Sequence, residues 1–405
     1  MNEGGHSATS NESYNLALPA APSSGPTRYP NEPERYMQVL INEVRADPAA
    51  FGYPAYPAQP PVVYQANLNY AARAHATVST LPGGSGGHVD WADRGPGDRA
   101  VASGYDHIYV SENMGSGAPT AVAVAGANHG FLNSHGHRDN MLCAGTLETG
   151  LGFYYLWPER WGSWVETFGG REGLAIPHLP AGAVAPFEGR PGDSFTYVVN
   201  YYHASGLTPT AAQVVVDGVA HNMTVSAGAA GNATYRYSDT LAQGYGHTYY
   251  FQFTFPGGSA RLPETSAFSG PRVHGDAPDL DIGWLTVPTG PVSLGLPVNL
   301  SAWVQNHGTL AAENAVIRFY QGDPQAGGGS IGEAVVTVAP DSSQTANITW
   351  TPAIAGQHYL YAVADPANLI AEWSEENNVR RDQVTVLDLS HRVYLPLALA
   401  DHPGP

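Results

Sequence analysis

Hydrophobic residues recur at helical spacing in the first third of the chain and at strand spacing after it. The first helical segment begins at Asn31, which is followed three residues later by Glu34, and it stops at Asp47-Pro48. The pattern predicts helices over residues 31–47, 67–78 and 120–132, and strands over residues 150–156 and 161–168. Helices that precede strands indicate a mixed α+β domain, which we place at residues 31–172.

From about residue 185 onward, short β-branched and aromatic runs alternate with turns rich in Gly, Pro, Asn and Asp. This spacing is typical of β-sandwiches. The strand-like runs include residues 195–199, 213–216, 249–255, 298–304 and 315–320. A cluster of Gly, Pro and Asp near residues 271–278 divides the region into two all-β sandwiches, 180–275 and 277–388. We expect both sandwiches to fold independently of the first domain.

The two ends of the chain lie outside the three predicted domains. Residues 1–30 are rich in Ser, Pro, Ala and Asn and predict a disordered leader. Residues 389–405 form a C-terminal tail with one short strand-like run at 393–399.

Charge and composition exclude several classes of function. The 405 residues carry a net charge of −18, so nucleic acid is not an expected partner. All 17 basic residues are Arg, which excludes Schiff-base chemistry on a Lys and a P-loop Lys. No apolar stretch is long enough to predict a membrane span. The single cysteine, Cys143, allows no intrachain disulfide.

Four short segments in the first domain occur in a characteristic order. Gly87-His88 is followed by Pro96-Gly97-Asp98-Arg99, then by Ser111-Glu112-Asn113, and then by Asn133-Ser134-His135-Gly136-His137-Arg138. In this order and spacing the region resembles the bacterial branch of the CAP superfamily, named for cysteine-rich secretory proteins, antigen 5 and pathogenesis-related proteins. The resemblance covers about a third of the chain and implies an α-β-α sandwich.

The resemblance also implies a cleft with a few polar residues at its centre. His88, Glu112 and His137 match family positions, whereas Ser134 stands where many eukaryotic members have an acid. Two imidazoles and a carboxylate are a reasonable ligand set for a divalent metal, with zinc the first choice. The alternative is a polar network that only orients loops. Glu112, His137 and Ser134 are weaker candidates for catalytic residues, since no third group completes a nucleophile and base.

Other polar residues of the first domain are expected to be structural. His75 lies among apolar helix positions and predicts a buried, hydrogen-bonded side chain. Arg99 and Arg138 are expected to bond backbone carbonyls or carboxylates with their planar guanidinium groups. His129 and His135 are minor candidates for lining the same cleft as His137.

The last sandwich carries a second resemblance. Asp365 to Glu372, followed by Glu375-Glu376-Asn377-Asn378, resembles the closing segment of the CARDB module, an adhesion-related domain of bacteria. The resemblance implies an immunoglobulin-like sandwich, and we extend that fold to residues 180–275. The acidic residues around Glu372 could hold calcium, although a solvated acidic turn is the favoured interpretation.

Three functions remain open. The first is an exported CAP protein whose cleft binds a divalent metal, a small hydrophobic or polymeric ligand, or both, displayed on the β modules. The second is a surface adhesion protein that binds cells or extracellular polymers without a metal. The third is a metal-dependent hydrolase of peptide or glycan material. The polar N-terminus shows no signal sequence, but CAP and CARDB domains are both typically exported, so we expect a secreted or cell-surface location.

Overall fold

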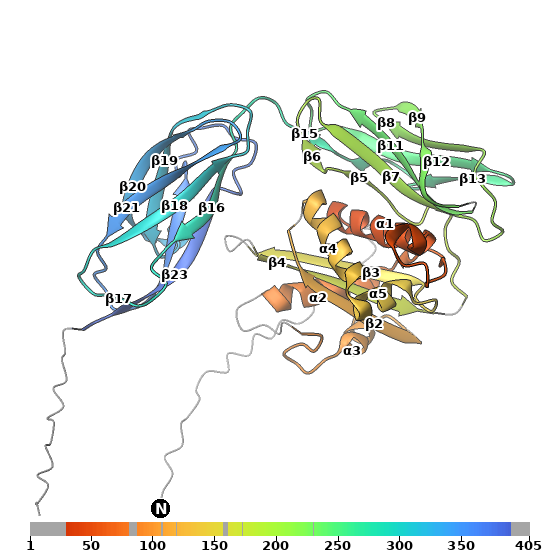
Figure 1. Ribbon diagram of the computed structural model, residues 1–405, viewed down its shortest axis with the longest axis horizontal. Coiled ribbons are helices and arrows are strands. Elements are labelled where there is room, and N and C mark those ends of the chain that lie inside the picture. The colour runs from red at the N-terminus through yellow and green to blue at the C-terminus, as the bar shows by residue number, and fades with distance from the viewer. Residues whose placement is uncertain are drawn as a thin grey trace, which may run out of the picture.

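The computed structural model describes residues 30–80, 87–106, 108–118, 120–156, 161–171, 173–229 and 231–389. It is a multi-sheet, mostly β structure whose helices are confined to the first part of the chain, apart from one short 3-10 turn (Figure 1). The predicted leader up to residue 29 and the tail from residue 390 lie outside the described residues.

The first part of the chain contains one four-stranded sheet in the order β1-β3-β4-β2. Its helices are α1 (Glu32–Ala46), η1 (Pro48–Phe51), α2 (Ala66–Thr80), α3 (Pro96–Ala102), α4 (Ala121–Asn133) and α5 (His135–Leu142). Its strands are β1 (Val63–Tyr64), β2 (Tyr109–Ser116), β3 (Glu148–Leu156) and β4 (Trp161–Gly170). The three predicted helices and both predicted strands are confirmed within a few residues, whereas β2, α3 and α5 were not predicted.

Helix α1 begins where the sequence predicts. Asn31 accepts a hydrogen bond from the backbone N–H of Glu34, and the Glu34 carboxylate accepts one from the Asn31 N–H, each at 3.0 Å. This reciprocal capping box satisfies two backbone donors that the first helical turn leaves unpaired. Asp47 is the C-cap residue of α1 and also the N-cap residue of η1, where its side chain accepts a hydrogen bond from the Ala50 N–H.

Strand β3 is packed between helices because its side chains alternate in size. A Cβ atom at Gly150 or Gly152 would overlap the backbone of α2, at Leu68 and Ala72 respectively. Leu151, between these glycines, is fully buried in the core cluster that contains Met37 of α1. Alternate residues of a strand point to opposite faces, so α2 covers one face of the sheet and α1 the other (Figure 1).

The middle part of the chain is a β-sandwich of two antiparallel sheets, β10-β11-β7-β5 and β13-β12-β8-β9, with β14 added beside β12 and a separate β15-β6 pair. The strands are β5 (Gly182–Ala185), β6 (Glu188–Gly189), β7 (Ser194–Tyr202), β8 (Ala211–Val216), β9 (Val219–Asn222), β10 (Thr224–Ala229), β11 (Asn232–Thr240), β12 (Thr248–Phe255), β13 (Gly258–Leu262), β14 (Phe268–Ser269) and β15 (Arg272–Val273). Aromatic side chains dominate the core between these sheets.

The last part is a second sandwich, with sheets β16-β18-β21 and β17-β23-β22-β19-β20. The elements are β16 (Leu280–Thr286), β17 (Val292–Ser293), β18 (Val298–Asn306), β19 (Ala312–Gln321), η2 (Pro324–Ala326), β20 (Gly329–Val338), β21 (Ser342–Trp350), β22 (Gly356–Ala364) and β23 (Val379–Leu387). All five strand-like runs expected in the β region fall within strands. Within the described residues, no helix combines the length and hydrophobicity needed to cross a bilayer.

The first part and the middle sandwich share a core. Val39 of α1 is fully buried in a cluster with Ala181, Ala183 and Val198 of the middle sandwich. The Asn200 side chain donates to the Val39 carbonyl at 3.2 Å. The outer face of α1 is therefore covered by the sheet of β5, β7, β10 and β11, and the expectation that the middle sandwich folds without the first domain needs revision.

A smaller joint connects the middle and last sandwiches. The Arg190 guanidinium donates to the Asp341 carboxylate at 3.0 and 3.3 Å and to the His307 carbonyl, and it lies 4.8 Å from the centre of the Trp373 ring. The Trp373 indole N–H donates to the Gly275 carbonyl at 2.6 Å. This joint is made of polar and ring contacts, unlike the apolar contact around Val39.

Candidate functional site

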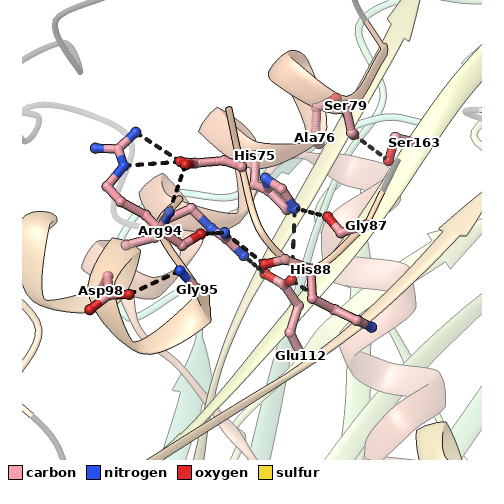
Figure 2. Close-up of polar contacts among 12 residues, drawn as sticks. His75, Ala76, Ser79, Gly87, His88, Arg94, Gly95, Asp98, Glu112 and Ser163 are labelled. Carbon is pink, nitrogen blue, oxygen red and sulfur yellow. Dashed lines mark hydrogen bonds and ion pairs between the residues drawn. The ribbon is translucent and has the colours of Figure 1, made fainter. Parts of the chain in front are cut away.

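Glu112, on β2, is the centre of a buried polar cluster (Figure 2). Its Oε2 accepts a hydrogen bond from Arg99 Nη2 at 2.6 Å, and its Oε1 lies 3.1 Å from His88 Nδ1. Glu112 and Arg99 are 5% and 4% exposed. A buried carboxylate needs a partner of opposite charge, and here Arg99 supplies it.

Arg99 is held in place by the short helix α3. The Asp98 carboxylate accepts from the Gly95 N–H at 2.9 Å and so caps this helix. Arg99 Nη1 donates to the carbonyls of His88 and Arg94, at 3.0 and 2.6 Å. One guanidinium thus fixes the carboxylate on β2 and the loop that carries His88, which confirms the structural role expected for Arg99.

His75 closes the cluster from α2. Its Nε2 lies 3.0 Å from the Gly87 carbonyl and 3.8 Å from Glu112 Oε1. The side chain is buried, and burial lowers the pKa of His75. A neutral imidazole bonded to a backbone carbonyl is the core histidine that the sequence predicts.

His88 and His137 differ in their surroundings. The His88 side chain is 50% exposed, and its hydrogen bond to Glu112 raises the pKa of His88. Burial lowers the pKa of His137, and the nearby charge of His88 lowers it further. The His137 ring packs edge-on against Phe131, with ring centres 5.2 Å apart. The charge of His88 thus acts on His137, while the hydrogen bond to Glu112 comes from His88.

A second buried network lies behind the cluster. Asn113 donates to Glu166 Oε2 at 2.9 Å and to the His137 carbonyl at 3.1 Å, and it accepts from Asn140 at 2.9 Å. Glu166 is fully buried, and burial raises its pKa to about 8. The network connects β2 and β4 to helix α5. Sequence reasoning missed Glu166, because a single acid in a strand-like run gives no sign of what faces it.

The remaining candidates are placed apart from Glu112. Ser134 is the N-cap residue of α5, and within the described part of the chain no hydrogen bond joins it to His137. His135 is exposed and lies 3.2 Å from Asp139, while His129 bonds Asn133 at 2.8 Å. These two histidines belong to the surface of α4 and α5.

The predicted metal set of His88, Glu112 and His137 is only partly assembled. Across the described ranges, no three His, Cys, Asp or Glu side chains are arranged to hold a metal ion. Both Glu112 oxygens already have partners, one in Arg99 and one in His88. The imidazoles of His88 and His137 remain the groups with ligand chemistry, and the zinc site stays a prediction.

Comparison with protein families identifies the last sandwich. Residues 277–382 match the CARDB family. These residues are a CARDB domain. The closing segment from Asp365 to Asn378, on which the sequence resemblance rests, lies inside the matched range. No curated protein matches the chain.

Solved structures similar to parts of the chain include three from microbes. The CARDB domain of a Pyrococcus furiosus protein, in complex with di-metal ions, is 24% identical over 29% of this chain and 99% of that chain, with a TM-score of 0.25. An extracellular protein of Bacillus anthracis that contains an SCP domain is 20% identical over 34% and 41%, with a TM-score of 0.27. An outer surface protein of Borrelia burgdorferi is 17% identical over 36% and 98%, with a TM-score of 0.27.

The acidic segment of the CARDB domain is partly buried. The Glu372 carboxylate accepts from the Leu280 N–H and, at 3.1 Å, from the Asn378 side chain, which also donates to Glu375 at 3.2 Å. Burial, together with the neighbouring charge of Glu375, raises the pKa of Glu372 to about 8. Glu372 therefore caps the start of β16 rather than standing in solvent, and calcium binding here stays a prediction.

Proposed function

We propose that the chain is an exported binding protein whose first domain is of the CAP type and takes a divalent transition metal at His88 and His137. The order of the motifs around His88, Glu112 and His137 supports the CAP assignment. CAP and CARDB domains both typically occur in exported proteins, which supports a location outside the cell. The middle sandwich and the CARDB domain then act as display or adhesion modules.

The observation that carries the proposal is the double engagement of Glu112. With Oε2 bonded to Arg99, Oε1 is aimed at Nδ1 of His88. A carboxylate bonded to one ring nitrogen of a histidine fixes its tautomer and leaves the other nitrogen available as a ligand. Glu112 therefore suits an orienting role better than a ligand role. Two imidazoles leave coordination positions for water or for a ligand from solution.

Hydrolysis is the less favoured function. Ser134 caps α5, and no described side chain joins it and His137 into a nucleophile, base and orienting group. The arrangement supports binding rather than acyl transfer. A metal-free adhesion protein remains the main alternative, in which Glu112 and its partners only hold the loops.

Zinc titration of the metal-stripped full chain tests the proposal. We expect His137→Ala to lose most of the zinc affinity measured by calorimetry. Glu112→Gln should weaken it about 10–100-fold, the usual cost of an outer-sphere partner. The matched control is His135→Ala, two residues away on the same helix but bonded to Asp139, which should bind as the wild type does.

Acid should weaken zinc binding, because both imidazoles must be neutral to bind a metal. The bond to Glu112 raises the pKa of His88, so affinity should begin to fall at a pH above the ordinary value of about 6.5. Negligible heats of zinc binding for the wild type and for every variant, together with a lower melting temperature of His137→Ala, would contradict the metal site. They would indicate that these residues form a structural network.

A further inference from the structure

The outer face of the middle sandwich carries a row of polar side chains that runs across four strands. Asn222 of β9, Gln213 of β8, Gln252 of β12 and Arg261 of β13 are successive partners in the strand register. Cross-strand partners point to the same face of a sheet. Neighbouring strands lie about 4.8 Å apart, so the row extends about 14 Å over a face whose opposite side is the aromatic core.

The amides in this row bond to one another in one direction. Gln252 Nε2 donates to the side-chain oxygen Oε1 of Gln213 at 3.1 Å, and Gln213 Nε2 donates to the side-chain oxygen Oδ1 of Asn222 at 3.1 Å. A primary amide has two N–H donors and two acceptor lone pairs, and each of these bonds uses one of them. Gln213 and Gln252 therefore keep donors and acceptors for a second partner, while their own orientation is fixed.

Arg261, at the end of the row, is also held in place. Its guanidinium lies 3.8 Å from the centre of the Tyr250 ring. It donates to the Pro263 carbonyl at 2.5 Å and to the Ser266 carbonyl. A side chain that is already ordered loses little conformational entropy when a ligand binds to it.

Three members of the row, Gln213, Gln252 and Arg261, line a groove. A cavity of about 520 Å³ is bounded by Gln213, Gln252, Thr254, Ser259, Arg261 and Glu264. A second cavity, also of about 520 Å³, shares Ser259, Arg261 and Glu264 with it and extends to Arg35 and Gln38 of α1. Each volume falls within the range of about 300–1,000 Å³ that ligand sites occupy. The groove thus leads from the open sheet face to the junction with the first domain.

We propose that this groove binds a neutral oligosaccharide. A sugar hydroxyl both donates and accepts, as does each amide of the row, so amides and hydroxyls match along its length. Two charged side chains, Arg261 and Glu264, line the cavity that contains Gln213 and Gln252, and their charges cancel. This balance favours a neutral ligand over an anionic one. The elongated row suits a chain of sugars, and the site is separate from the Glu112 cluster, so it does not depend on metal binding.

Calorimetry with defined hexasaccharides tests the proposal on the full chain. The probes are cellohexaose, chitohexaose and maltohexaose, with hexagalacturonate as an acidic comparison. We expect at least one neutral probe to bind and its affinity to fall at least tenfold in the Gln213→Ala/Gln252→Ala variant. Both side chains lie on the outer face of their strands, so the variant should melt at the wild-type temperature.

The matched control is Gln357→Ala/Gln383→Ala, which removes two exposed glutamines from the CARDB domain and should bind as the wild type does. A second variant, Ser259→Asp, adds a negative charge within the groove and should reduce binding by filling it. The proposal is overturned if no neutral probe binds at millimolar concentration, if hexagalacturonate binds more tightly than every neutral probe, or if the Gln213→Ala/Gln252→Ala variant binds as well as the wild type.

Discussion

Glu112 and Glu166 are buried on neighbouring strands and are stabilised in different ways. Glu112 is bonded to the buried guanidinium of Arg99 at 2.6 Å. Glu166 receives one described hydrogen bond, from the Asn113 amide, and its Oε1 is buried without a partner among the described residues. Burial without a cation favours the protonated acid, as the raised pKa of about 8 reflects.

Stability should therefore depend on pH through Glu166. The folded state keeps its proton up to a pKa of about 8, while the ordinary value is 4.5. The contribution of Glu166 to the free energy of unfolding is fully present below pH 4.5 and is lost as the pH rises through 8. We expect Glu166→Gln, which mimics the protonated acid, to raise the melting temperature at pH 9 by several degrees and to change it little at pH 5.

Glu148 provides the contrast for that measurement. It is buried and bonded to Arg171 at 2.5 Å and to the Tyr105 hydroxyl at 2.7 Å. Glu148→Gln removes one charge of an ion pair and should lower the melting temperature at both pH values. Equal melting curves for Glu166→Gln and the wild type at pH 9 would show that Glu166 is ionised and compensated in the folded protein.

At the scale of elements, the sequence predicts what hydrophobic periodicity can encode. Helix α1 has a capping box and buries Met37, Ile41 and Val44, so both its start and its face can be predicted. Strand β2 was missed because its middle residues, from Ser111 to Asn113, are polar although they face buried partners. Helices α3 and α5 have only seven and eight residues, too few for a clear apolar face.

The same limit applies to the candidate site. Motif order predicts that His88, Glu112 and His137 come from one region, and the structure places His88 against Glu112. The partner on the other carboxylate oxygen, Arg99, is set by how α3 packs on β2. Arg99 and Glu112 are only 13 positions apart, but their pairing depends on how two consecutive elements pack, which hydrophobic periodicity does not specify.

The segment around Glu372 supports a prediction for the CARDB domain. If its carboxylates hold calcium, millimolar calcium should raise the melting temperature of this domain by mass action. Since burial raises the pKa of Glu372 to about 8, calcium must displace a proton at lower pH, and the increase should be larger at pH 8.5 than at pH 6. The Glu372→Gln/Glu375→Gln variant should show no increase, and an equal increase in that variant would assign the effect to other groups.

For the whole molecule, the three bodies are joined by contacts of different strength. The first part and the middle sandwich share the buried cluster of Val39 and Val198, reinforced by a 2.6 Å ion pair between Glu43 and Arg236. The CARDB domain is attached through the more exposed contacts of Arg190. Composition breaks along the sequence mark all these junctions alike, because composition does not report how much apolar area crosses a junction.

Calorimetry should therefore resolve two unfolding transitions rather than three. The first part and the middle sandwich share one of these transitions. We expect Val39→Ala to lower its free energy of unfolding by about 2 kcal/mol, because apolar burial is lost and a small cavity is left. The CARDB transition should not move. Val384→Ala, at a buried position of the CARDB domain, should destabilise the CARDB transition and leave the shared transition unchanged. Separate transitions for the first part and the middle sandwich would mean that their shared core adds little.

The contact between Asn200 and the Val39 carbonyl joins residues 161 positions apart. Chains are synthesised at about 5–20 residues per second, so the partner of α1 emerges on the order of 10–30 s after α1 itself. During that interval the outer face of the helix is exposed to whatever surrounds the nascent chain. The first domain therefore depends for its final burial on a segment made much later, and truncation before residue 200 should yield an aggregation-prone product.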